Sequence, residues 1–212
     1  MGRGWKIPAL AAARKKRGMR MLLALAAVLL LSACGERTPS AYVRGAQLSK
    51  KESAVADLLS GDDGACLFDF HAPRGAKSAR FRIYKLKGGA WRAVDGESTF
   101  AVSAPSGRIA LQFDKIPDGV RVSLTGDGVS LHHDFAGKKA DTAGRTRAIS
   151  QLEEAQSAEC GREIPLVIQY FSNREKIDAL AVDSFYHPEK YGKENGDLIY
   201  AVTVTFRTQA LL

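Results

Sequence analysis

Several sequence signatures of catalytic and redox proteins are missing from this chain of 212 residues. Its three cysteines form no Cys-x-x-Cys pair, the spacing typical of zinc and dithiol redox sites. No Gly-x-Ser-x-Gly nucleophile motif occurs, and the paired glycines lie between predicted strands rather than before a helix that could bind phosphate. We therefore expect a non-catalytic protein that binds no cofactor and no metal.

The positive charge of the chain is concentrated near its N-terminus. The formal net charge is +8, from 31 basic and 23 acidic residues. Seven of the basic residues and none of the acidic ones precede Cys34, which leaves 24 basic and 23 acidic residues for the rest of the chain. Proteins that bind nucleic acid need a basic surface on the folded domain. We therefore expect no nucleic-acid partner.

The early basic residues belong to a pattern for export. Residues 14–17, Arg-Lys-Lys-Arg, precede an apolar run over residues 21–31, and small residues follow the run. This order is typical of a secretory signal peptide. The run is shorter than the roughly 20 apolar residues that a transmembrane helix needs. Met1, Met19 and Met21 are alternative starts, although a start at Met21 would remove every one of the early basic residues.

The apolar run ends in Leu31-Ser32-Ala33-Cys34, which resembles the lipobox of bacterial lipoproteins. The resemblance implies that the Cys34 thiol is lipidated and that the signal is cleaved just before it. It also implies an extracytoplasmic protein anchored to the cell membrane or the outer membrane. Gly35 replaces the aspartate typical of inner-membrane retention, which favours the outer membrane in a Gram-negative cell. We predict a signal peptide at residues 1–33, a lipidated tether at 34–44 and a folded domain at 45–212.

Two cysteines remain for the folded domain if Cys34 carries lipid. Outside the cytoplasm, two thiols in one domain are usually oxidised, so we expect a disulfide between Cys66 and Cys160. The chain-entropy model gives such a long closed loop roughly 4–5 kcal/mol of stabilisation. The alternative is a pair of free, buried cysteines.

Hydrophobic periodicity predicts an all-β fold with one short N-terminal helix. A capping-box pattern at Ser49 and Glu52, followed by apolar residues at helical spacing, predicts a helix over about residues 49–60. Later residues alternate apolar and polar in short runs separated by turns. Residues 147–158 suit either a short helix or a strand and turn, and residues 177–185 are expected to form a strand. Burying one face of each run predicts an antiparallel β-sandwich or open barrel.

Two pairs of side chains are candidate binding residues. Tyr84 and Trp91 share one face of a predicted hairpin, and exposed aromatic side chains can stack on sugars or anchor protein partners. The alternative is that Trp91 only packs across strands. His132 and Asp134 project to one side of a predicted strand, close enough to share a cation or a proton. A metal site needs three or four such ligands, so the alternative is a solvated strand end.

These features together predict a membrane-anchored, extracytoplasmic protein-interaction module. Its partners would be the membrane, through the lipid anchor, and an envelope protein bound through a sheet edge or the aromatic hairpin. The alternative function is that of a domain that binds a glycan or a small ligand. Metal-dependent hydrolysis is the third hypothesis.

Overall fold

The computed structural model describes residues 39–60, 65–137, 139–191 and 196–211. All of them belong to one structural unit, Pro39–Leu212. The predicted signal peptide, Cys34 and the start of the predicted tether lie outside the described residues. Strand β1 begins at Tyr42, within the range predicted as tether. Among the described residues, no helix is long and apolar enough to cross a membrane.

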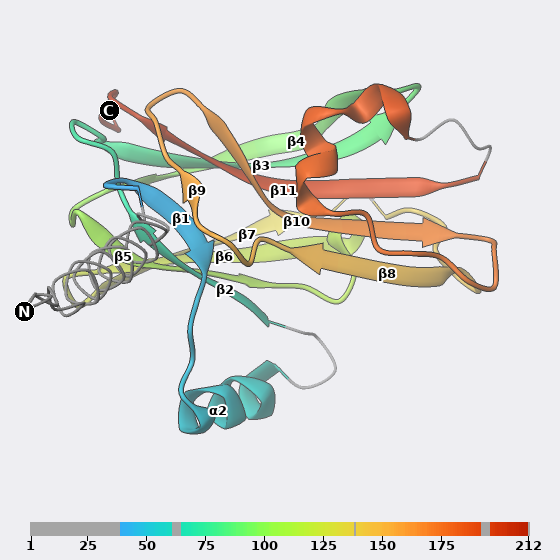
Figure 1. Cartoon of the computed structure of the whole chain (residues 1–212), viewed down its shortest axis with the longest axis horizontal. Helices are drawn as coiled ribbons and strands as arrows, with labels where there is room; N and C mark the ends of the chain where they lie inside the picture. Colours follow the sequence, from blue (N-terminus) through green and yellow to red (C-terminus); the bar gives the residue numbers. More distant parts are fainter. Residues whose placement is uncertain (1–38, 61–64, 138, 192–195, 212) are drawn as a thin grey trace, which may run out of the picture. The chain divides into compact units, whose positions relative to one another are not determined.

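Two sheets make up the fold (Figure 1). The six-stranded sheet has the order β7-β6-β5-β2-β1-β9, and the five-stranded sheet has the order β4-β3-β11-β10-β8. Every pairing is antiparallel, which confirms the predicted all-β sandwich class. The six-stranded sheet consists of β1 (Tyr42–Gly45), β2 (Ala65–His71), β5 (Ser106–Gln112), β6 (Gly119–Gly126), β7 (Val129–Ala136) and β9 (Gln156–Ser157). The five-stranded sheet consists of β3 (Ser78–Lys87), β4 (Ala90–Ala101), β8 (Thr146–Gln151), β10 (Glu163–Ser172) and β11 (Leu198–Arg207).

The main core lies between the two sheets. Alternating residues of β5 and β6 face inward, so Ile109 lies opposite Leu124 and Leu111 opposite Val122, and all four are buried. Phe81 of β3 belongs to the same buried cluster. The alternation seen in the sequence therefore selects the core face of each strand, because successive side chains of a strand point to opposite faces of its sheet.

The predicted N-terminal helix is α2 (Lys50–Ser60). Its first turn has the predicted capping box, since the Ser49 N–H donates to Glu52 Oε2 at 2.8 Å and the Glu52 N–H donates to Ser49 Oγ at 3.3 Å. Residues 147–158 contain strands β8 and β9, so the helical alternative for this segment is wrong.

The connection between β10 and β11 folds back over the outer face of the five-stranded sheet (Figure 1). It contains the 3-10 helices η2 (Val182–Tyr186) and η3 (Pro188–Lys190), and a third, η1 (Ile116–Asp118), precedes β6. The predicted strand at residues 177–185 is therefore wrong. Its apolar residues Ile177, Leu180 and Phe185 instead pack on the sheet in a second hydrophobic cluster.

Cys66 and Cys160 are both free, so the structure does not contain the predicted disulfide. Strand β1 lies between β2 and β9, and Tyr42 pairs with both His71 and Ser157. From this shared row, Cys66 is five residues away along β2, roughly 17 Å at the usual rise of a strand. Cys160 follows β9 in the opposite direction. A disulfide requires Cα atoms less than about 7 Å apart, so strand pairing keeps the two thiols separate.

Candidate functional site

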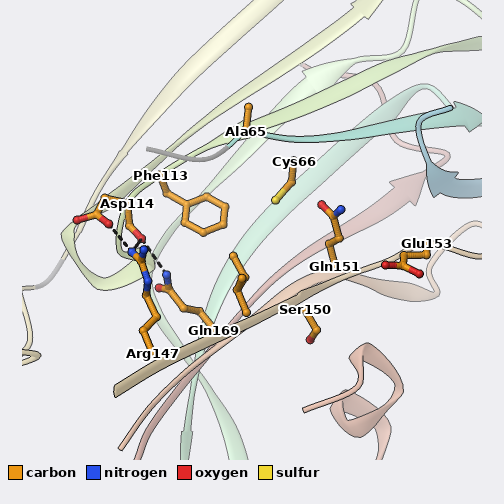
Figure 2. A pocket seen from close by; sticks show the side chains of 10 residues that line it. Ala65, Cys66, Phe113, Asp114, Arg147, Ser150, Gln151, Glu153 and Gln169 are labelled. Carbon is orange, nitrogen blue, oxygen red and sulfur yellow. Dashed lines mark hydrogen bonds and ion pairs between the residues drawn. The ribbon is translucent and has the colours of Figure 1, made fainter. Parts of the chain in front are cut away.

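A pocket of about 480 Å³ opens between the two sheets (Figure 2). Strand β8 forms one wall, with Arg147, Ile149 and Gln151 facing the space between the sheets. Cys66 of β2 and Phe113, just after β5, point in from the other sheet. The pocket volume lies within the range of about 300–1,000 Å³ typical of small-molecule sites.

The pocket exists because the two sheets are not equally wide at this corner. The β1–β2 ladder ends where Gly45 pairs with Phe68, and the chain then leaves the sheet toward helix α2. The first residues of β2, including Cys66, therefore have no β1 residue beside them. As a consequence, Ile149 on the facing strand remains 46% exposed although it points inward.

A fixed polar wall borders the apolar floor of this pocket. The fully buried Gln169 accepts a hydrogen bond from the Ile116 N–H at 2.7 Å through Oε1 and donates one to the Asp114 carbonyl at 2.8 Å through Nε2. Arg147 donates to the same carbonyl at 2.9 Å and pairs with the Asp114 carboxylate. Because these groups satisfy one another, the wall is held in position without a ligand.

The pocket floor contains a thiol that is chemically quiet. Burial raises the pKa of the Cys66 thiol from 9.0 to about 11. The reactive form of cysteine is the thiolate, so at neutral pH this side chain behaves as a small apolar group. We therefore assign Cys66 to the apolar floor and not to a nucleophilic role.

The predicted aromatic pair lies on the outer face of the five-stranded sheet, but it is not an exposed platform. The Trp91 ring stacks on Phe185 with ring centroids 5.1 Å apart, and its indole N–H donates to the Phe185 carbonyl at 2.8 Å. Tyr84 contacts the same phenyl ring edge-on at 5.8 Å. The connection between β10 and β11 thus covers the aromatic hairpin.

A small polar cluster borders the covered aromatic residues. The Glu163 carboxylate accepts hydrogen bonds from the Tyr84 hydroxyl at 2.9 Å and from Thr203 Oγ1 at 2.8 Å. Next to it, Arg82 binds Glu97 with its nearest nitrogen 2.7 Å from the carboxylate. Each charged group of this cluster has a partner within the face, so the cluster holds the sheet surface together.

The second predicted pair lies on β7, at the margin of the six-stranded sheet. His132 and Asp134 both point to the outer face and are exposed. Asp134 binds Arg121 of β6, with oxygen–nitrogen distances of 2.6 and 3.1 Å. This hydrogen-bonded guanidinium lowers the pKa of the Asp134 carboxyl. Among the described residues, no group of three or more potential metal ligands occurs.

The inner side of β7 carries an exposed apolar row that the sequence does not reveal. By strand register, Val129, Leu131 and His133 lie opposite inward-facing residues of β6. Even so, Val129 is 50% exposed and Leu131 is 36% exposed. Together with residues 101–104, both line a shallow hollow at the margin of the sandwich. The alternation predicts that they face inward, but which strand ends the sheet is decided by pairing between distant segments.

Sequence reasoning misses the pocket for the same reason. Its lining comes from four separated segments that share no motif, namely residues 65–66, 113–114, 147–153 and 169. The local hint is the mixed inward row of β8, where a charged, an apolar and an amide side chain alternate with the small residues Thr146, Ala148 and Ser150. Comparison with protein families, curated proteins and solved structures found no match to this chain.

Proposed function

We propose that this protein is a lipid-anchored, extracytoplasmic interaction module that binds an extended segment of a partner protein along β7. The observation that carries the proposal is the combination, on one strand, of a sheet margin and exposed inward-facing apolar residues. In the described part of the chain, β7 pairs only with β6. The partner chemistry that fits is a β-strand with apolar residues on alternate positions.

The backbone of β7 provides the affinity in this proposal. An edge strand has unpaired N–H and C=O groups along its outer side, and a partner strand can add to them by β-augmentation. Natural proteins usually protect such edges with lysine, proline or short length. The eight residues of β7 contain neither lysine nor proline.

The side chains of β7 provide the specificity. Alternate residues of an added strand would face the shallow hollow beside Val129 and Leu131 and cover their exposed apolar surface. Burying apolar area stabilises a complex by roughly 25 cal/mol per Å² before the costs of association. The outward row, which contains the Arg121–Asp134 ion pair, stays solvated at the rim.

The experiment is photo-crosslinking of the anchored protein in its native cells, with the crosslinker placed at Ser130 of β7. We expect a reproducible envelope protein whose crosslinked peptide has alternating apolar residues. Leu131→Lys should abolish the crosslink, because it places a charge on the inward row. His132→Lys is the matched control on the outward row of the same strand, and it should retain the crosslink. Equal loss in both variants, or no captured peptide, would contradict the proposal.

The lipid anchor is the second part of the proposal and is tested separately. It is supported by the lipobox-like Leu-Ser-Ala-Cys sequence and by the basic and apolar segments before it. Stable attachment needs more than one acyl chain, and the lipoprotein resemblance implies several. Cys34→Ala should move the protein from the membrane fraction to the soluble fraction. Unchanged membrane retention of this variant would contradict the anchor, whatever the outcome for β7.

A further inference from the structure

The burial pattern of β8 differs from that of its neighbours β10 and β11, whose side chains are buried on both faces of the sheet. Its inward-facing residues, Arg147, Ile149 and Gln151, are exposed, whereas its outward-facing neighbours are half-buried. The Ser150 hydroxyl even donates to the Leu180 carbonyl of the segment that covers the outer face. The pocket therefore lies beside the inward face of β8, where inward-facing side chains of a sandwich normally form the core.

We propose that this opening is a binding site for a small amphipathic molecule with an apolar body and a neutral or cationic polar end. The site is independent of the β7 edge, because it lies between β8 and β2 and shares no residue with the hollow beside β7.

The apolar body fits the inner part of the pocket. Phe113 and Cys66 are buried at 6% and 7% exposure and form its floor, and Ile149 provides the opposite apolar wall. A ligand between them would complete the layer of apolar contacts that sheet pairing leaves unfinished at this corner. The Gln169 side chain already hydrogen-bonds the Ile116 N–H and the Asp114 carbonyl, so the polar end of a ligand gains little by turning toward this wall.

The polar end is selected by charge at the rim. Arg147 is paired with Asp114, whereas Glu153 has no ion-pair partner among the described residues. The rim thus presents one uncompensated negative charge next to the amide of Gln151. The Glu153 carboxylate repels a negative charge and attracts a positive one, so an anionic end group is disfavoured at this rim.

Two fluorescent probes with the same aromatic body test the site in the full chain. N-phenyl-1-naphthylamine is neutral, and 8-anilinonaphthalene-1-sulfonate adds a sulfonate to the same ring system. We expect saturable binding of the neutral probe at one molecule per chain, with binding of the sulfonate weaker by about three- to tenfold. Glu153→Gln should reduce that difference, because it removes the negative charge at the rim. Stronger binding of the sulfonate would overturn the predicted ligand chemistry.

A filling substitution locates the bound probe. Ile149→Trp should fill the pocket and abolish saturable binding of the neutral probe. Leu211→Trp is the matched control, since it replaces a similarly exposed apolar residue that lies outside both the pocket and the β7 surface. It should leave probe binding unchanged. If the two variants bind the probe equally, the site is not this pocket.

A measurement without a change in the pocket wall covers the case in which Ile149→Trp fails to fold. In a Cys34→Ser, Cys160→Ser chain, Cys66 is the only cysteine. At alkaline pH, where part of the thiol ionises, the neutral probe at saturation should slow alkylation of Cys66 by iodoacetamide at least about threefold, because it occupies the path to the thiol. An unchanged rate would overturn the proposal.

Discussion

The outer faces of the two sheets differ, although the strands of both sheets point successive side chains to an inner and an outer face. The outer face of the five-stranded sheet carries a second hydrophobic cluster under the β10–β11 connection. In the described part of the chain, the outer face of the six-stranded sheet carries ion pairs, such as Arg121–Asp134 and Arg108–Asp69, and the short helix α2 contacts β2. Outward residues of β10 and β11, such as Ile168 and Ala201, are apolar and form a packing surface, whereas the charged outward residues of the other sheet are solvated.

The lengths of the connections explain this difference. Neighbouring strands β5, β6 and β7 follow one another through short links, including the turn at Asp127 and Gly128. Such turns have no residues left over to cover a sheet face. The connection between β10 and β11 is long enough to return over its own sheet, and Phe185 within it meets both Trp91 and Tyr84. Burial of an outward residue thus depends on a segment far away in sequence.

The largest expected effect separates the two faces by stability. Trp91→Ala removes the ring stacked on Phe185 and leaves a carbonyl without its indole donor. We expect a loss of about 3 kcal/mol in the free energy of unfolding, near the lower end for tryptophan replacements. His132→Ala, on the solvated face, should leave the unfolding midpoint unchanged. Urea unfolding followed by circular dichroism measures both.

The results for Trp91→Ala and His132→Ala decide whether one sheet face is covered and the other solvated. If Trp91→Ala costs no more than His132→Ala, the β10–β11 connection does not cover the hairpin in solution. Trp91 would then be available as a binding platform, and the interaction surface should be sought on the five-stranded sheet.

The second-largest expected effect concerns the interior between the sheets, represented by the buried Cys66, and not either outer face. A buried thiol whose pKa is about 11 in the folded protein and 9.0 when exposed holds its proton more tightly in the folded state. This preference stabilises the fold below pH 9 and is lost as the pH rises toward 11. Relative to Cys66→Ala, the wild-type protein should lose about 2 kcal/mol of stability by pH 11. Unfolding curves at pH 8 to 11 measure the difference, and parallel curves for the two proteins would mean that the Cys66 thiol is solvated. The pH range of this measurement is roughly that in which thiols and phenols ionise.

The third expected effect tests the boundary of the covered face. Tyr84→Phe removes the hydroxyl that donates to Glu163 and leaves the ring contact with Phe185 in place. We expect a loss of about 1 kcal/mol, the usual contribution of one hydrogen bond. Thr203→Val removes the other donor to the same carboxylate and should have a similar cost. Double-mutant analysis gives their coupling, and strict additivity would contradict a shared cluster around Glu163.

The fold class follows from local sequence because alternation is a local property. The inward positions Ile109, Leu111 and Val122 are predicted from period two alone, and the capping box at Ser49 and Glu52 begins helix α2 as expected. Residues 177–185 are the exception. They are apolar enough to resemble a strand, but their partner is the face of a sheet, so they pack by side chains without joining a ladder.

The candidate sites could not be predicted in the same way. Tyr84 and Trp91 do share a face, as the hairpin pattern indicates, yet their exposure depends on Phe185, more than ninety residues later in the chain. The pairing of Cys66 with Cys160 fails for a related reason. A count of cysteines contains no information about register, and it is the register through β1 that places the two thiols apart.

The smallest expected effect tests the solvated face directly. Asp134→Asn breaks the ion pair with Arg121, in which both side chains are more than half exposed. Exposed pairs contribute little because solvent and salt screen them, so the unfolding midpoint at pH 7 should not change measurably. The lowered pKa of Asp134 gives the sign of the pH dependence. Its contribution is present above the ordinary carboxyl pKa of 3.8 and disappears as the pH falls through the folded value. Any small difference between wild type and variant in low salt should therefore vanish at acid pH and in molar salt. A large difference that survives molar salt would mean that this face is covered in solution as well, and the contrast between the two sheets would then fail.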